Sequence, residues 1–191
     1  MAPGLAQEHP MLEVQYSHVP AEHAIPGLLA RDFDVAITER YPHDPHSPAA
    51  GIERVATVPD ELVLAVPAPY AAASFRELAD APWVMEPVGT AARSWALDRC
   101  RSAGFEPGVR FETADLVLHA TLIGAGLAVG FIPRLGIRPT LDARLEPSGD
   151  HREISISVRR GSRGHPAIDA VTRALGRALE DLTRATGSPG R

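Results

Sequence analysis

The sequence contains no lysine, so all 19 of its Lys and Arg positions are arginine, and 24 Asp and Glu residues leave a net charge of −5 over 191 residues. A protein that holds DNA or RNA through many phosphate contacts needs an excess of basic side chains. The acidic balance therefore argues against broad, direct binding of nucleic acid by this chain.

Cysteine is almost absent too, since Cys100 is the only one. A single cysteine excludes an intrachain disulfide and a zinc cluster built on cysteines, and it favours a reducing compartment. No stretch approaches the about 20 apolar residues that cross a bilayer. Residues 1–10 also lack the basic start and apolar run of a signal peptide. We therefore expect a cytoplasmic protein with no membrane partner.

Apolar runs that are predicted as strands alternate with segments of helical periodicity along most of the chain. This alternation predicts an α/β fold with largely parallel sheets. The segment 40–51 is crowded with Pro and His and is predicted as a loop. The predicted strands are 11–16, 35–37, 54–58, 61–67, 83–85, 111–112, 127–132 and 154–159, and the predicted helices are 21–31, a short one from 74, 91–103, 114–125 and 166–185.

The glycine-rich run 124–130 (GAGLAVG) invites comparison with a dinucleotide-binding loop. Such a loop follows a strand and opens a helix, whereas these glycines close a predicted helix and open a predicted strand. Their order favours capping of a helix C-terminus. Motifs of the common hydrolases, zinc proteases and phosphate loops are absent from the sequence, and Cys100 is interpreted as a passive thiol rather than a nucleophile. We predict no catalytic residue.

Histidines gather at His18 and His23 and again in the segment 43–46 (HDPH). Metal binding is conceivable there, but no third ligand follows at a fixed spacing, which favours solvated polar side chains. We predict neither a metal nor a cofactor. His119 lies on an otherwise apolar helical face, and we interpret it as a satisfied imidazole in the core or beside a hinge.

The segment 86–93 (EPVGTAAR) joins the end of a predicted strand to the start of a predicted helix, and Thr90 can cap that helix. Open α/β sheets bind ligands at such junctions. Free backbone N–H groups, the Thr90 hydroxyl and the Arg93 guanidinium would together suit a carboxylate or a similar anion. The alternative is a capped helix that carries a surface arginine, and the residues alone leave both interpretations open.

Four stretches follow one another along the chain: HPMLEVQY at 9–16, LLARDFDVAI at 28–37, ERVATVPDELVLAVPAPY at 53–70 and AGLAVGFIPRL at 125–135. In this order they resemble the effector-binding domain of LysR-type transcriptional regulators. The resemblance covers nearly the whole chain, and the last stretch is the most specific of the four.

The resemblance implies the type 2 periplasmic-binding-protein fold, in which two Rossmann-like α/β subdomains are joined by two crossing strands. Subdomain I would comprise 1–60 plus 133–191 and subdomain II would comprise 61–132, with a small-molecule effector in the cleft between them. Thr90 and Arg93 would hold an anionic group, Thr38 would offer a hydroxyl and Phe131 would give an apolar contact. Carried over by position, the effector-binding residues are Thr38, Pro87, Thr90, Arg93, Gly130 and Phe131.

The family's winged helix-turn-helix and the first strand and turn of its effector domain are missing from the matched stretches, so we expect an N-terminally truncated chain. The resemblance implies a domain that senses a small, anionic metabolite and modulates DNA binding and transcription through a missing N-terminal head. A homodimer or tetramer is expected. The alternatives are a transporter's solute-binding protein, which would need a signal peptide or a lipid-attachment cysteine, and an enzyme on the same fold, which would need a catalytic Thr or a metal cluster.

Overall fold

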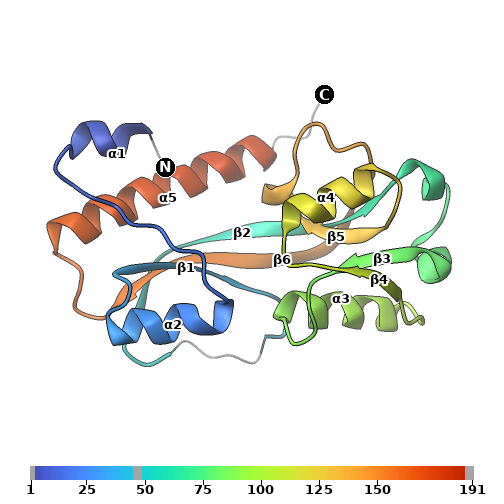
Figure 1. Ribbon diagram of the computed structural model, residues 1–191, viewed down its shortest axis with the longest axis horizontal. Helices are drawn as coiled ribbons and strands as arrows, with labels where there is room; N and C mark the ends of the chain where they lie inside the picture. Colours follow the sequence, from blue (N-terminus) through green and yellow to red (C-terminus); the bar gives the residue numbers. More distant parts are fainter. Residues whose placement is uncertain (1–2, 45–48, 188–191) are drawn as a thin grey trace. The chain divides into compact units, whose positions relative to one another are not determined.

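The computed structural model describes residues 3–44 and 49–187, and the chain divides into two compact units (Figure 1). Unit 1 comprises residues 1–40, 45–59 and 153–191, and unit 2 comprises residues 41–44 and 60–152. Two long strands, β2 (Ile52–Val66) and β6 (Arg144–Arg159), each belong to both units.

Over the described residues, unit 1 combines β1 and parts of β2 and β6 with the helices α1, α2 and α5. Strand β1 pairs with the second half of β6, so that Thr38 lies opposite Ser155. Helix α2 packs against β1, and helix α1 packs along α5 (Figure 1). Leu5 of α1 forms a small buried cluster with Ala170 and Ala174 of α5, which buries the apolar stripe of that amphipathic helix. The elements are α1 (Pro3–Glu8), α2 (Ala21–Ala30), β1 (Val35–Arg40) and α5 (Pro166–Gly187).

Unit 2 has short strands with a helix on either side of them, α3 and α4 (Figure 1). Side chains alternate along β3: Trp83 and Met85 pack in one core cluster with residues of α3, and Val84 packs in a second cluster with Ile123 of α4. Strands β3 and β4 are parallel, and β5 is antiparallel to the end of β2. The elements are η1 (Ala68–Tyr70), η2 (Phe75–Asp80), β3 (Pro82–Met85), α3 (Ala91–Ser102), β4 (Gly108–Glu112), α4 (Leu116–Gly124), β5 (Gly130–Pro133) and η3 (Arg134–Gly136).

The glycine-rich run closes α4, as its order predicts. The helix ends at Gly124, and Gly126 has a φ of 75°, a left-handed backbone conformation that favours glycine. The Gly126 N–H donates to the Ile123 carbonyl and the Leu127 N–H donates to the Leu122 carbonyl, at 2.8 and 3.0 Å. These bonds satisfy carbonyls of the last helical turn, so the run is a helix C-cap followed by the strand β5.

Residues 11–16 do not form the predicted strand. They follow an irregular path without strand pairing, and Met11 and Tyr16 are 93% and 83% exposed. Alternation of apolar and polar residues buries one face only where a neighbouring strand offers pairing partners and a core below. In the part of the chain that the structure describes, this segment has no strand partner, and only its Leu12 packs against a buried cluster, that of Leu5, Ala170 and Ala174.

The prediction of largely parallel sheets is wrong for the larger sheet. That sheet has the strand order β1-β6-β2-β5, and both the β1–β6 and β2–β5 pairs are antiparallel. Helical crossovers produce parallel pairs between strands that are neighbours in the chain. Here β1 pairs with a strand more than one hundred residues later, so the local alternation does not set the direction. The predicted strands 54–58 and 61–67 likewise form the single strand β2.

The predicted subdomain limits, 1–60 plus 133–191 and 61–132, stay a prediction. In the compact units the chain leaves unit 1 between residues 59 and 60 of β2 and returns between residues 152 and 153 of β6. The predicted return to subdomain I lies earlier, at residue 133, where β5 pairs with β2 inside unit 2.

Candidate functional site

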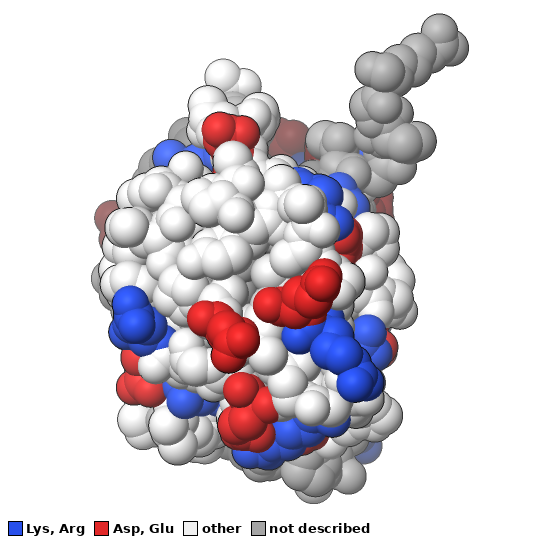
Figure 2. All heavy atoms as spheres, turned by 90° about the vertical axis from the view of Figure 1, so that its right-hand side faces the viewer, with Lys and Arg blue, Asp and Glu red and all other residues white. Residues whose placement is uncertain are grey.

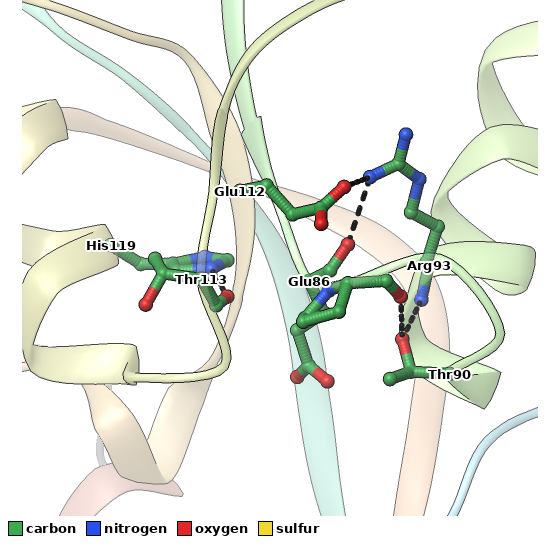
Figure 3. A network of polar contacts seen from close by, with 7 residues as sticks. Glu86, Thr90, Arg93, Glu112, Thr113 and His119 are labelled. Carbon is green, nitrogen blue, oxygen red and sulfur yellow. Dashed lines mark hydrogen bonds and ion pairs between the residues drawn. The ribbon is translucent and has the colours of Figure 1, made fainter.

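Thr90 caps the helix α3 with its hydroxyl. The oxygen Oγ1 accepts a hydrogen bond from the Arg93 backbone N–H at 3.2 Å and donates one to the Pro87 carbonyl at 3.0 Å (Figure 3). The capping role was predicted from the sequence, and it is confirmed. Because the hydroxyl proton is already donated to the Pro87 carbonyl, the hydroxyl could donate to an effector only if that bond broke, whereas its second lone pair could still accept.

Arg93 joins the ends of β3 and β4. Its Nη1 donates to the Glu86 carbonyl at 3.0 Å and to the Glu112 carboxylate at 2.9 Å (Figure 3). The side chain is 14% exposed, and its Nε is buried without a hydrogen-bond partner among the described residues. An anion that approaches this guanidinium therefore competes with the Glu112 carboxylate for it.

Gly130 permits a close approach between β5 and β3. A Cβ atom at this position would lie 2.9 Å from Cγ1 and 3.0 Å from the carbonyl oxygen of Val84. Both neighbours belong to the buried strand β3, so a larger residue would push the strands apart. Gly130 thus has a packing role that explains why glycine is needed here.

Phe131 belongs to an aromatic cluster of unit 2. Its ring centroid lies 4.8 Å from that of Trp95 in an edge-to-face arrangement and 5.8 Å from that of Trp83. Such geometry adds a modest attraction to the burial of the rings. Phe131 is partly exposed, so one part of its ring remains accessible.

A pocket in unit 2 adjoins this cluster. It is a small recess with a cavity volume of about 30 Å³ that is partly open to solvent, and its lining is mostly apolar and aromatic. The polar residues Tyr41, Glu86 and His119 belong to the lining, and no arginine does. The lining residues are Tyr41, Leu62, Val84, Met85, Glu86, Ala92, Trp95, Ala96, Leu116, His119, Phe131 and Pro133.

Only some of the predicted site residues line this pocket. Phe131 lines the pocket, whereas Pro87, Thr90, Arg93 and Gly130 belong to unit 2 without being part of the lining. Thr38 belongs to unit 1, where it is half-buried on β1. Their shared role in effector binding stays a prediction.

His119 is among the pocket residues that sequence reasoning missed. It is 2% exposed on α4, and its Nε2 lies 2.8 Å from the Thr113 carbonyl oxygen. Its Nδ1 is buried without a hydrogen-bond partner among the residues described. Burial lowers the pKa of this imidazole, against a smaller opposing effect of the bond to Thr113. The sequence signal was a lone polar residue on an apolar helical face, and it does not distinguish a satisfied histidine from an unsatisfied one.

The described residues contain no group of three or more His, Cys, Asp or Glu side chains that could hold a metal ion. His46, one of the histidines considered from the sequence, lies outside the described residues. Over the same described ranges, no helix is both long enough and apolar enough to cross a membrane.

Charges of both signs are mixed on the face shown in Figure 2. Arginine and acidic side chains lie side by side in its lower part, and its upper part is mostly uncharged. This face therefore presents no continuous basic surface, which agrees with the acidic net charge of −5.

Comparison with protein families assigns residues 1–180 to the LysR substrate binding domain. The chain belongs to this family. Comparison with curated protein sequences gave no match. The resemblance inferred from the four sequence stretches is thereby confirmed over residues 1–180 of the chain.

Solved structures show the same fold. The C-terminal domain of a probable LysR family transcriptional regulator from Rhodococcus sp. RHA1 is 22% identical with a TM-score of 0.68, and the match covers 89% of this chain and 87% of that one. CbnR, a LysR family transcriptional regulator, is 20% identical with a TM-score of 0.64, and 92% of this chain matches 62% of CbnR. The BenM effector binding domain with its effector benzoate is 15% identical with a TM-score of 0.65, over 97% of this chain and 86% of that one.

These likenesses establish the fold of this LysR substrate-binding domain. It is the type 2 periplasmic-binding-protein fold of LysR effector-binding domains, in agreement with the predicted α/β class. The domain spans 62% of the length of CbnR, so the activities of the longer regulators enter below as proposals.

Proposed function

We propose that this chain is the effector-sensing domain of a LysR-type transcriptional regulator and that it binds a small molecule in the pocket of unit 2. The observation that carries the proposal is the pocket itself, a small apolar and aromatic recess whose lining also includes the polar residues Tyr41, Glu86 and His119. Small-molecule sites have this composition, in which apolar walls supply affinity and a few polar groups supply orientation.

We favour a sensor over an enzyme. None of the lining residues is Ser, Thr, Cys or Lys, the side chains that most often act as nucleophiles. Cys100 is fully buried, and burial raises the pKa of its thiol to about 12, so the reactive thiolate is disfavoured. The family match favours a regulator over a transporter's solute-binding protein.

Control of transcription is part of the proposal. The full-length CbnR structure is a complex with its target DNA. In the regulator proposed for the present chain, the DNA contacts would belong to an N-terminal head. The acidic balance of the present chain supports that division, because phosphate contacts need basic side chains. Effector binding would then act by favouring one of two arrangements of a homodimer or tetramer.

Tryptophan fluorescence tests the proposal, because Trp95 lines the pocket and Trp83 does not. Benzoate and benzyl alcohol serve as an anionic and a neutral probe of similar size. We expect a probe that enters the pocket to change the emission of Trp95 and to raise the thermal unfolding midpoint. The Trp95→Phe variant should lose most of the emission change and keep the thermal shift. A panel of small aromatic and aliphatic compounds that changes neither property would contradict the proposal.

The predicted anionic character of the effector has its own test. If Arg93 contacts the anion, Arg93→Met should weaken benzoate binding by about tenfold, which is within the range of a charge-assisted hydrogen bond. Glu112→Gln should strengthen binding, because it releases the Arg93 guanidinium from its carboxylate partner. Unchanged affinity in both variants would remove Arg93 from the site and leave a neutral effector as the better description.

A further inference from the structure

The pocket of unit 2 is smaller than a ring-sized molecule. Its cavity volume is about 30 Å³, whereas most small-molecule sites enclose roughly 300–1,000 Å³. An effector with an aromatic ring therefore enters only if a side chain of the lining moves. Leu62, Val84 and Met85 of the lining are almost fully buried on the strands β2 and β3, and moving them would disturb the closely packed core of unit 2.

Trp95 is the largest side chain of the lining, and it belongs to the helix α3 rather than to a strand. The residue is 4% exposed. Its ring centroid lies 4.8 Å from that of Phe131 and 6.1 Å from that of Tyr41. The polar edge of the indole has a different partner, because Nε1 donates a hydrogen bond to Asp150 Oδ2 at 3.0 Å. The indole therefore connects the wall of the pocket to the strand β6.

Asp150 lies in an irregular part of β6. Gly149 has a φ of 84°, a left-handed conformation that interrupts the extended backbone, and the Asp150 N–H donates to Ser148 Oγ at 3.1 Å. Arg99 of α3 donates from Nη2 to the Ser148 carbonyl at 2.9 Å, and its Nε lies 3.7 Å from Asp150 Oδ2. These contacts hold the carboxylate in place. Its side chain is nevertheless 31% exposed, so water can solvate it when the indole leaves.

We propose that Asp150 is a positioning residue for the pocket, and that its hydrogen bond to Trp95 is a latch. The latch holds the indole where the recess is small, and an effector with a ring breaks this bond as it enters. The inference rests on the proposed function, because it concerns the same pocket. Part of the binding free energy is then used to break the bond, which lowers the affinity and selects for effectors whose apolar contacts compensate for the loss.

Benzyl alcohol is a suitable probe, because it has an aromatic ring and no charge that would respond to the loss of a carboxylate. In isothermal titration, Asp150→Leu should bind it about tenfold more tightly than the wild type, the scale of one hydrogen bond to a charged group. Asp150→Asn keeps an oxygen acceptor without the charge, so its gain should be smaller.

Glu106→Leu is the matched control for these variants. Glu106 accepts two hydrogen bonds from Arg101 of the same helix α3, at 2.8 and 2.9 Å. Its replacement therefore removes a carboxylate that pairs with an arginine of α3 and leaves the bond between Trp95 and Asp150 intact. This variant should bind benzyl alcohol as the wild type does.

Nitrogen NMR on the wild-type chain tests the latch without a variant at Asp150. With ¹⁵N-labelled tryptophan, benzyl alcohol should move the indole N–H proton of Trp95 to lower frequency and speed its exchange with solvent, because the bond to Asp150 is lost. Trp83 is the internal reference, since its Nε1 donates to the Leu78 carbonyl at 2.9 Å and the residue is not part of the lining. Its resonance should stay in place. The Trp95→Phe spectrum assigns the two resonances.

Unchanged or weaker binding of benzyl alcohol in Asp150→Leu would overturn the inference, and so would an equal gain in Glu106→Leu. A Trp95 N–H that keeps its position and exchange rate in the bound wild type has the same meaning, and it decides the matter if Asp150→Leu does not fold. Absence of benzyl alcohol binding in the wild type and in both Asp150 variants also overturns the latch. The proposed function is judged separately, by the response of the wild-type emission and thermal midpoint to benzoate and the wider panel.

Discussion

Asp60 forms a buried ion pair where β2 enters unit 2. Arg152 of β6 donates from Nε to the Asp60 Oδ2 at 2.9 Å, and its Nη2 lies 2.9 Å from the same oxygen. The other carboxylate oxygen accepts the Leu135 backbone N–H at 2.9 Å. The side chains of Asp60 and Arg152 are 1% and 8% exposed. One carboxylate therefore joins β2, β6 and the turn η3.

Replacing Asp60 by Leu should destabilise the protein strongly. Removal of one partner of a buried ion pair costs about 3–5 kcal/mol, because the remaining charge stays desolvated and no longer has an opposite charge to attract it. The Leu135 N–H loses its acceptor at the same time, which places the expected loss near the upper end, about 4–5 kcal/mol. Most domains are stable by only about 5–15 kcal/mol, so this loss should be visible as a large shift of the urea midpoint.

The assay is equilibrium urea unfolding followed by far-ultraviolet circular dichroism, applied to a double-mutant cycle. The variants are Asp60→Leu, Arg152→Met and the double variant, which replaces the pair with apolar side chains. We expect the double variant to be more stable than Asp60→Leu, with a coupling of at least about 2 kcal/mol. Glu61→Ala is the matched control, because its pair with Arg134 is partly exposed and should contribute below about 1 kcal/mol.

Two results would refute this reasoning. If Asp60→Leu is no more destabilising than Glu61→Ala, burial does not strengthen the interaction. If the losses of Asp60→Leu and Arg152→Met simply add in the double variant, the two side chains do not act as a pair. An unchanged dependence of the unfolding free energy on urea concentration is needed for either comparison, since it shows that the variants unfold to the same extent.

Two further predictions concern buried titratable groups. Burial holds the pKa of His119 below its ordinary value of 6.5, so its contribution to stability should be complete above pH 6.5 and be lost as the pH falls through the folded-state pKa. The free energy of unfolding should therefore decrease more for the wild type than for His119→Gln on mild acidification, and parallel curves would contradict this. Cys100 is fully buried, with a thiol pKa raised to about 12 by burial. We expect it to react with iodoacetamide only after unfolding in urea, and rapid modification of the folded chain would show that the thiol is accessible.

Local signals in the sequence predicted the elements of unit 2 well. Thr90 and Gly104 mark the two ends of α3, and both act through hydrogen bonds or backbone conformations of their own turn. The glycines after α4 were interpreted correctly for the same reason. By contrast, the alternation in residues 11–16 gave no information about whether a partner strand exists, and the predicted strand is wrong.

The site was harder to predict because its contacts are distant in sequence. Arg93 was recognised as a candidate anion ligand, but its partner Glu112 lies 19 residues away on another strand. Phe131 was predicted from the resemblance and does line the pocket. His119 was interpreted as satisfied, because the sequence shows that a helical face is apolar but not which polar atoms find partners once that face is buried.

The two long strands β2 and β6 also have a consequence for the cooperativity of folding. Each continues from one unit into the other. If one unit unfolds, both strands are therefore interrupted where they enter the other unit. Both tryptophans, Trp83 and Trp95, belong to unit 2, whereas the 22-residue helix α5 belongs to unit 1. Emission thus reports on one unit and helical ellipticity largely on the other. We expect the two signals to change together in a single transition, because the shared strands couple the two units.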